Sequence, residues 1–304
     1  MALNLHHLRL FAAVVDHGGF TRAAEALNLS QPAISKSLKE LEAGLGLSLI
    51  DREGRSLRLT DAGRALHSRA RELFGVERVA ERELRELRGL KRGALRIAAS
   101  TTIATYLLPP VLGRFHLRHP RVRIQTSSAN TRAVLRLLLE ARVDLALVEG
   151  PVSDAGVIAH PWRDDELVVI APRDHRLLSE RRVTVEDVAA ERMLVREPGS
   201  GTREVSESAL ARHGIRLTRT MRVGGTEAIK QAVAAGLGLA IVSRAAAADQ
   251  LALGRIAVLH VEGLTIKRTL TRLELRDRTA TVAAREMVEL LYEDNGNADA
   301  SGVG

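Results

Sequence analysis

The chain has 304 residues, of which 45% are hydrophobic, and it carries a formal net charge of +8. This length leaves room for two or three domains with ordinary cores, and the positive charge permits a polyanionic partner without identifying one. Cysteine is absent, which excludes disulfides, thiolate metal sites and cysteine nucleophiles and favours a reducing cytosol.

The N-terminal residues, MALNLHHLRLF, lack the long apolar core of a signal peptide. No run of about 18 apolar residues occurs anywhere in the chain, so a membrane span is not expected. We therefore expect a cytoplasmic protein without a membrane partner.

Residues 1–59 are predicted to form short helices followed by a hairpin. Apolar residues recur at helical spacing in LRLFAAVV, and HGG ends that helix. Thr21 is the predicted cap of a second helix, and Ser30 caps a third helix with Pro32 in its first turn. The segment DREGRSLRLT then predicts two short strands around Gly54. Three helices and such a wing are typical of a winged helix-turn-helix domain.

The third helix has a polar face that a helix serving only as core would not need. In a helix-turn-helix unit, the second helix of the pair lies in the major groove, with its N-terminal residues nearest the bases. Gln31 can pair with adenine through two hydrogen bonds, whereas Lys39 is expected to neutralise phosphate. The alternative is an ordinary solvated helix face. The predicted DNA-contacting residues are Thr21, Ser30, Gln31, Pro32, Ser35, Lys36, Lys39 and, at the wing tip, Arg55.

Residues 60–88 are predicted to form one long helix that pairs two copies of the chain. Apolar residues alternate at steps of four and three over three heptads, interrupted once by Glu77, which is the pattern of a coiled-coil seam. The alternative is an amphipathic helix packed on its own domain, but so long a helix has little else against which to bury its stripe. The predicted dimerisation residues are Leu66, Ala70, Leu73, Ala80, Leu84 and Leu87.

Residues 89–295 have a different pattern, in which short β-rich runs alternate with helical segments of ten to fifteen residues. Runs such as ALRIAAS, VDLALVEG and ELVVIAP alternate in this way, which predicts a doubly wound α/β fold with mostly parallel strands. The final residues, 296–304, lack apolar periodicity and are predicted to be disordered.

Three segments of this α/β region lead from a loop into a helix and are candidates for an anion site. They are ASTT at 99–102, REPGSGTRE at 196–204 and GGTEAIKQAVAAG, which places Thr226 at a helix start. Helix starts offer unpaired N–H donors and a positive dipole end, so three converging starts favour a carboxylate, a sulfur oxyanion or a phosphate. The alternative is that each is an ordinary helix cap. The predicted effector-binding residues are Ser100, Thr101, Thr102, Gly199, Ser200, Gly201, Thr202, Arg203 and Thr226.

The stretch GGFTRAAEALNLSQPAISKSLKELEAGLGLSLIDR, followed by LTDAG, closely resembles the N-terminal signature of LysR-type transcriptional regulators. The resemblance covers residues 4–292 and implies a winged helix-turn-helix, a dimerising linker helix and an effector domain similar to type 2 periplasmic binding proteins. It also implies a homodimer or homotetramer that bends promoter DNA, a small co-inducer as the bound molecule, and RNA polymerase as a further partner. Two positions depart from the commonest family form: Ile50 replaces a frequent phenylalanine, and Lys36 replaces a frequent arginine, which weakens the case for guanine readout.

The same resemblance divides the effector domain into two subdomains, residues 93–163 with 267–292 and residues 164–266. It places the three helix starts on the two walls of the cleft between them, where Arg203 would supply a counter-charge. The runs EPGSGTR and GGTEAIKQAVAAGLGLAIVSR look most like the branch that controls carbon fixation or sulfite and cysteine metabolism. Effectors in that branch are phosphorylated metabolites, reduced nicotinamide dinucleotide phosphate or small sulfur oxyanions.

Two other classes of protein, an enzyme and a solute-binding protein, fit the sequence less well than a regulator. PGSGTR is neither a G-x-S-x-G elbow nor a P-loop, and HLRH at 116–119 lacks the H-E-x-x-H zinc pattern, so we expect no catalytic residue, no metal site and no cofactor. A solute-binding protein would fit the second half of the chain alone, but it would bind no DNA, whereas a regulator binds DNA with a steep salt dependence.

Overall fold

The computed structural model describes residues 3–51, 57–87, 94–276 and 278–298. The chain divides into two compact units, residues 1–85 and 86–304. None of the described helices is both long and apolar enough to cross a membrane.

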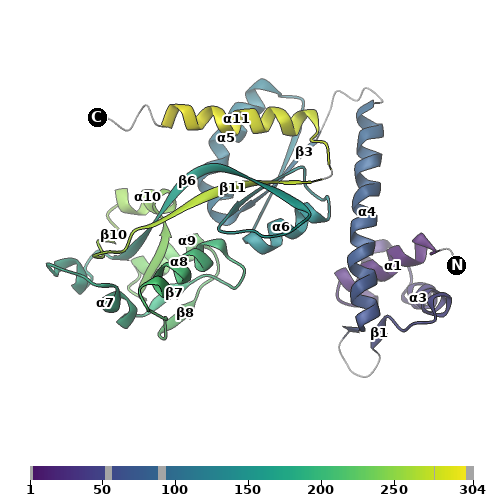
Figure 1. The fold of residues 1–304 in the computed structure, drawn as a ribbon, viewed down its shortest axis with the longest axis horizontal. Coiled ribbons are helices and arrows are strands. Elements are labelled where there is room, and N and C mark those ends of the chain that lie inside the picture. Colours follow the sequence, from purple (N-terminus) through teal and green to yellow (C-terminus); the bar gives the residue numbers. More distant parts are fainter. Residues whose placement is uncertain (1–2, 52–56, 88–93, 277, 299–304) are drawn as a thin grey trace. The chain divides into compact units, whose positions relative to one another are not determined.

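The N-terminal unit contains four helices and a two-stranded hairpin (Figure 1). Its elements are α1 (Leu5–Asp16), α2 (Phe20–Leu27), α3 (Gln31–Leu45), β1 (Ile50–Asp51), β2 (Arg58–Leu59) and α4 (Asp61–Leu87). Strands β1 and β2 pair antiparallel, with Ile50 opposite Leu59, as predicted for a wing. Ile50 is buried in the core of this unit. Isoleucine in place of the phenylalanine that is frequent in the family is therefore a core substitution.

Helix α3 begins where its sequence predicts. The hydroxyl of Ser30 accepts a hydrogen bond from the Ala33 amide at 3.4 Å, and Gly46 ends the helix with a positive φ of 68°. The apolar stripe faces the core: Ile34, Leu38 and Leu41 are buried. The predicted cap of α2 is wrong, because that helix begins at Phe20, after Gly19, and Thr21 lies exposed inside it.

Helix α4 follows the predicted bounds, but its first half packs on its own domain. Ala70 is fully buried in the core of the N-terminal unit, and Leu66 packs against the same core. Glu77, which interrupts the predicted seam, forms an ion pair with Arg9 of α1 at 2.5 Å. The assignment of Ala70 to a dimer seam is therefore corrected, because its side chain is already covered within the chain, and Leu66 is partly covered by the same core.

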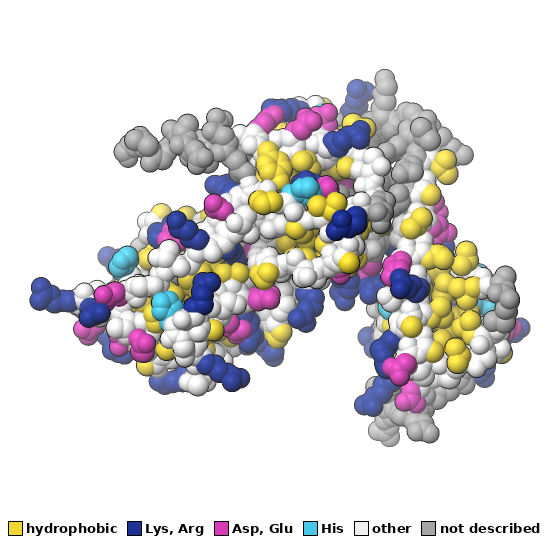
Figure 2. Space-filling model, viewed as in Figure 1, with side chains coloured by type: hydrophobic (Ala, Val, Ile, Leu, Met, Phe, Trp, Pro, Cys, Tyr) yellow, Lys and Arg dark blue, Asp and Glu magenta, His cyan; other side chains and the backbone are white. Residues whose placement is uncertain are grey.

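The second half of α4 leaves apolar side chains uncovered within the N-terminal unit. Leu73 is 39% exposed, Val76 is 70% exposed and Leu84 is 62% exposed, and Ala80 is also exposed. Figure 2 shows hydrophobic side chains gathered on the visible face of this unit. The side chain of Leu87 lies outside the described residues.

The C-terminal unit is an α/β structure whose described strands form one sheet of nine, ordered β4-β3-β5-β11-β6-β9-β7-β8, with β10 paired to β6. The strands are β3 (Ala94–Ser100), β4 (Arg123–Ala129), β5 (Leu145–Glu149), β6 (Val157–Pro172), β7 (Met193–Val195), β8 (Thr220–Arg222), β9 (Leu239–Ser243), β10 (Ile256–Leu259) and β11 (Ile266–Leu275). The helices are η1 (Ile103–Leu107), α5 (Leu108–Arg118), α6 (Thr131–Leu139), η2 (Arg176–Ser179), α7 (Val185–Ala190), α8 (Gly201–Arg212), α9 (Thr226–Ala234), α10 (Arg244–Ala252) and α11 (Val282–Ala298).

Two long antiparallel strands, β6 and β11, run side by side and connect the two halves of this unit (Figure 1). Strands β3, β4 and β5 pair parallel in the first half, and β7, β8 and β9 pair parallel in the second, as the α/β pattern predicted. The hydrophobic cores divide along the long strands: Trp162 and Leu270 belong to the first core, and Leu167 and Ile266 belong to the second. The carboxyl ends of β3, β5 and β7 and the start of α8 therefore come together between the halves.

The chain's last helix differs from the prediction. Helix α11 continues to Ala298, into the segment 296–304 that was predicted to be disordered, and the residues after it lie outside the described part of the chain. It packs beside α5 over the first core, to which it contributes Met287 and Leu291.

Candidate functional site

The predicted DNA-reading residues lie on the surface of the N-terminal unit. Gln31, Pro32, Lys36 and Lys39 of α3 are exposed, and Ser35 is half-buried. The ammonium group of Lys36 lies 3.9 Å from a carboxylate oxygen of Glu40, one turn along the same helix. The predicted wing-tip residue, at position 55, lies outside the described residues. Helix α3 thus presents a polar, largely unengaged face, as a groove-binding helix requires.

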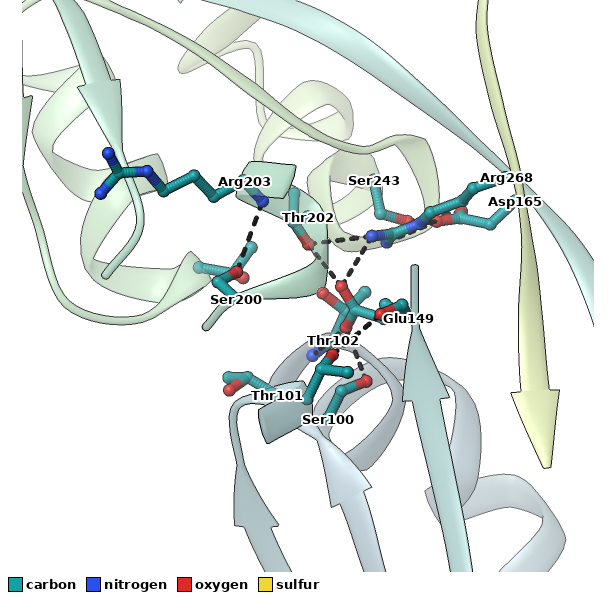
Figure 3. Close-up of polar contacts among 12 residues, drawn as sticks. Ser100, Thr101, Thr102, Glu149, Asp165, Ser200, Thr202, Arg203, Ser243 and Arg268 are labelled. Atoms are coloured by element: carbon teal, nitrogen blue, oxygen red, sulfur yellow. Dashed lines mark hydrogen bonds and ion pairs between the residues drawn. The ribbon is translucent and has the colours of Figure 1, made fainter. Parts of the chain in front are cut away.

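The predicted effector site is organised around a carboxylate that the sequence analysis did not identify. Glu149 ends β5, and its side chain is only 3% exposed (Figure 3). Its Oε1 accepts a hydrogen bond from the Ser100 hydroxyl at 2.7 Å and another from the Thr102 amide at 3.2 Å. Both donors stand where β3 ends and the helical run containing η1 begins, so the first predicted helix start does hold an anion.

The other oxygen of the same carboxylate binds groups from the second half of the unit. Glu149 Oε2 accepts hydrogen bonds from the Thr202 hydroxyl at the start of α8 and from Arg268 Nη1, the latter at 2.7 Å. Arg268 Nη1 also donates to Thr202 Oγ1 at 2.9 Å. The carboxylate therefore joins both halves of the effector unit. Three of its four donor residues, Ser100, Thr102 and Thr202, are ones that the sequence analysis assigned to an external anion.

Arg268 pairs with a second buried carboxylate. Its Nε donates to Asp165 Oδ2 at 2.7 Å, and Ser243 donates its hydroxyl proton to Asp165 Oδ1 at 2.7 Å. The side chains of Arg268 and Asp165 are 2% and 5% exposed. With Glu149 and Asp165 both ionised, the three charged groups of this cluster sum to one negative charge.

The charge state of Glu149 follows from these contacts. Burial of the carboxyl raises its pKa, but the Arg268 guanidinium and the hydroxyls of Thr202 and Ser100 lower it further, so that the pKa lies below its ordinary value. Glu149 is therefore an ionised, fully engaged acceptor at neutral pH.

One hydroxyl at this site has no hydrogen-bond partner among the described residues. Thr102 is 0% exposed, and its Oγ1 is buried and unpaired. A buried hydroxyl without a partner is energetically unfavourable, and such groups ordinarily bind a water molecule or a ligand. It lies one residue from Thr101 and beside the amide that binds Glu149.

A second guanidinium bridges the two halves. Arg196, which follows β7, donates through Nη1 to Thr226 Oγ1 at 3.0 Å and through Nη2 to Thr101 Oγ1 at 3.3 Å. It also forms an ion pair with Glu197 at 2.9 Å, which lowers the pKa of that carboxyl. Two of the predicted effector residues, Thr101 and Thr226, are thus brought together by an arginine that the prediction omitted.

The predicted counter-charge, Arg203, points elsewhere. Its Nε donates to Glu207 at 2.7 Å and its Nη1 to the carbonyl oxygen of Arg196 at 3.0 Å, away from Glu149 in Figure 3. Arg268 and Arg196 provide the cations instead. The expectation for Arg203 is corrected, because its position in the first turn of α8 directs its side chain along the helix toward Glu207.

The remaining residues of the glycine loop shape the backbone. Ser200 caps α8, accepting from the Arg203 amide at 3.5 Å, and Gly199 has a positive φ of 88°. A Cβ at Gly201 would lie 1.8 Å from the carbonyl oxygen of Glu149, so only glycine allows α8 to start this close to the end of β5. Gly199, Ser200 and Gly201 therefore position the site rather than supply its side chains.

A charged cluster also links the halves through the helices. Tyr106 of η1 donates its hydroxyl proton to Glu227 of α9 at 2.6 Å, and burial of the phenol together with this carboxylate raises the pKa of Tyr106 to about 12. Lys230 is fully buried between Glu227 and Asp249, at 3.0 and 2.7 Å.

Sequence analysis missed Glu149, Asp165, Arg196 and Arg268 because each belongs to a strand or to the residue after one. The signal for Glu149 was present: VDLALVEG is an apolar strand that ends in a carboxylate, directly followed by glycine. A charge at the end of a buried strand requires a partner, but the partner was not evident from sequence.

Both units match described families. Residues 5–64 match the bacterial regulatory helix-turn-helix protein, lysR family, and residues 88–295 match the LysR substrate binding domain. The chain is 38% identical over 297 residues to the uncharacterized HTH-type transcriptional regulator YeiE of Escherichia coli (strain K12), covering 98% of this chain and 99% of that protein. It is 36% identical over 294 residues to the RuBisCO operon transcriptional regulator of Allochromatium vinosum, covering 97% of each.

Among solved structures, the regulatory domain of CcmR from Synechocystis PCC6803, in complex with 2-PG, has 28% sequence identity to this chain and a TM-score of 0.63. The match covers 68% of this chain and 99% of that domain.

Proposed function

Because this chain belongs to the LysR family of transcriptional regulators, we propose that it binds promoter DNA as a homo-oligomer and responds to a small anion held between the two halves of its effector unit. Its relatives are named as transcriptional regulators, and the family is regulatory rather than catalytic. The proposal covers the contacts to DNA, the oligomer, the effector class and the coupling between them.

The DNA-binding proposal rests on the exposed face of α3. Its start, with Gln31 and Pro32, would meet base edges in the major groove, and Lys36 and Lys39 would contact phosphate. Two such helices in a dimer would occupy the half-sites of an inverted repeat about one helical turn apart.

The oligomer proposal rests on the exposed part of α4. Leu73, Val76, Ala80 and Leu84 follow one another at steps of three, four and four, and so share a face of the helix. A second copy of α4 would cover this face, and a pair of such dimers would give the homotetramer. RNA polymerase is a further proposed partner, as a regulator at promoter DNA requires.

The observation that carries the effector proposal is that two of the three predicted helix starts already hold a carboxylate. Two hydroxyls, one amide and one guanidinium converge on Glu149, and the unpaired Thr102 hydroxyl lies beside them. The same donors suit a sulfur oxyanion, a phosphorylated metabolite or a carboxylate. The likeness to a regulatory domain solved with 2-PG supports a small ligand of the effector unit.

A response to the effector requires that the effector bind two arrangements of the effector unit with different affinities. An effector shifts the arrangement of the halves, and with it the bend of bound DNA, only if it binds one arrangement more tightly than another. Donors from both halves surround Glu149, so an anion that engages all of them favours the arrangement in which they converge.

The test is a replacement of Thr102 by valine, which has the same shape and lacks the hydroxyl. Anion binding is followed by thermal unfolding of the full chain with sulfate, sulfite, 2-PG or small carboxylates, monitored through Trp162 fluorescence, because this single tryptophan lies in the effector unit. We expect Thr102→Val to lose the shift caused by the anion that binds the wild type.

The same variant also distinguishes a binding site from a helix cap. Because the Thr102 hydroxyl is unpaired, the unliganded Thr102→Val chain should unfold within about 0.5 kcal/mol of the wild type. Thr202→Val, whose hydroxyl is bonded to Glu149 and Arg268, is the comparison that should lose stability as well as anion binding. An anion-induced shift that survives in both variants would contradict the proposed site.

A further inference from the structure

The donors of the effector site are occupied by the chain itself. The Glu149 carboxylate accepts hydrogen bonds from the Ser100 hydroxyl, the Thr102 amide, the Thr202 hydroxyl and one nitrogen of Arg268. These are the groups that would donate to an external anion. An effector cannot bind these donors while the carboxylate remains among them.

Charge excludes the alternative that an anion binds beside Glu149. The cluster of Glu149, Asp165 and Arg268 already has one excess negative charge, and its side chains are at most 5% exposed. Arg196, the other guanidinium close by, is neutralised by Glu197. A second anion at the same donors would place further negative charge in a water-poor site beside two carboxylates, which is strongly unfavourable.

The backbone at this position is held by contacts that do not involve the Glu149 carboxylate. The carbonyl oxygen of Glu149 accepts a hydrogen bond from the Thr131 hydroxyl at 2.8 Å, and Gly201 packs against the same carbonyl. Gly150 follows with a positive φ of 78°. Displacement of the carboxylate from its donors therefore does not require these backbone contacts to break.

We propose that Glu149 is a built-in competitor of the effector: it fills the anion site of the free chain, and an effector anion binds by displacing it. This inference rests on the proposed function. It assigns to Glu149 the control of effector affinity, because the apparent affinity of an anion is reduced by the fraction of molecules in which the carboxylate occupies the donors.

Displacement of Glu149 also determines which anions the site selects. Arg268 loses one carboxylate and gains the effector, so the effector must replace the hydrogen bonds of Glu149 to donors on both halves. An oxyanion with three or four acceptor oxygens offers more acceptors to Ser100, Thr102 and Thr202 than a two-oxygen carboxylate, which leaves the Thr102 hydroxyl unpaired. The site therefore favours sulfur oxyanions and phosphate esters over carboxylates.

The experiment compares anion binding by the full wild-type chain and by Glu149→Gln. Isothermal titration calorimetry with sulfate, sulfite, 2-PG and acetate gives the dissociation constants, and Trp162 fluorescence during thermal unfolding confirms that each variant is folded. Glutamine keeps the shape and removes the charge, so we expect the oxyanions to bind at least about tenfold more tightly than to the wild type, with a smaller gain for acetate. Glu149→Asp, which is charged but too short to keep all the contacts, should give an intermediate gain and serves if the glutamine variant does not fold.

The matched control is Glu274→Gln, which removes one negative charge from the same unit. Glu274 pairs with Arg272 and His160, and it makes no contact with the Glu149 donors. Its anion affinities should equal those of the wild type.

The outcomes separate this inference from the proposed function. Equal affinity in the wild type and in Glu149→Gln would overturn the competitor role while leaving the anion site in place. Weaker binding by Glu149→Gln would mean that the carboxylate contacts the effector instead of competing with it, which also overturns the inference. Absence of binding by every variant with every probe would contradict the proposed effector class itself.

Discussion

The two units of this chain hold the side chains that we propose to bind anions in opposite ways. On α3 of the N-terminal unit, Gln31, Lys36 and Lys39 are exposed, and Lys36 has only a 3.9 Å contact with its helical neighbour. In the effector unit, the corresponding donors are buried, and an internal carboxylate already satisfies them.

The difference follows from the partners for which each surface is suited. DNA is a large polyanion, and a protein contacts it at many phosphates that remain surrounded by water and salt. Exposed side chains are therefore sufficient for binding, and the affinity depends on the salt concentration. A small anion must be removed from water almost completely, and this is favourable only if prearranged donors replace its hydration. Buried donors without an anion would themselves be unfavourable, which explains why the free chain supplies one of its own.

The largest expected effect tests the buried site. Arg268→Met would leave Glu149 and Asp165 buried without their shared cation, so we expect a loss of about 3–5 kcal/mol in the free energy of unfolding of the effector unit. Urea unfolding followed by Trp162 fluorescence measures it. Arg182→Met, at an exposed ion pair with Glu262, is the matched control and should cost less than about 1 kcal/mol. Equal losses would mean that burial of the Arg268 pair has no energetic weight.

An intermediate effect tests the exposed surface. Gln31→Ala should cost about 1–3 kcal/mol of binding at one base-pair position and leave binding to other sequences unchanged. Lys39→Ala should instead weaken all sequences alike and reduce the salt slope by about one. Footprinting and salt titration with a set of operator variants measure both. An unchanged footprint for Gln31→Ala would remove this residue from base readout.

The smallest expected effect is the pH dependence of stability that the buried Glu149 carboxylate causes. The pKa of Glu149 in the folded chain is below its ordinary value, so its carboxylate contributes stability that is present above the unfolded pKa of about 4.3 and is lost as the pH falls through the folded pKa. The difference in unfolding free energy between the wild type and Glu149→Gln should thus be constant from about pH 8 to 5 and change only below about pH 4. A change between pH 8 and 6 would show that Glu149 is not ionised in the folded chain.

Prediction from sequence succeeded where the determinants are local. The Ser30 cap, the stripe from Ile34 to Leu41 and the start of α4 all depend on residues three or four apart, whose relation is fixed by helix geometry. The dimer seam shows the limit: Leu66 and Leu84 have the same spacing pattern, yet one packs on its own domain and the other is exposed. Periodicity identifies an apolar face but not what covers it.

The sequence by itself determined the order of the elements, the helix starts at 99–102, 196–204 and Thr226, and their suitability for an anion. Only the tertiary structure decided which charges meet there. Thr202 and Arg268 lie 53 and 119 residues from Glu149 along the chain, and they contact it because β5, α8 and β11 end or cross at the same place. Long-range electrostatic partners depend on how the strands are ordered in the sheet, and no local spacing in the sequence encodes that order.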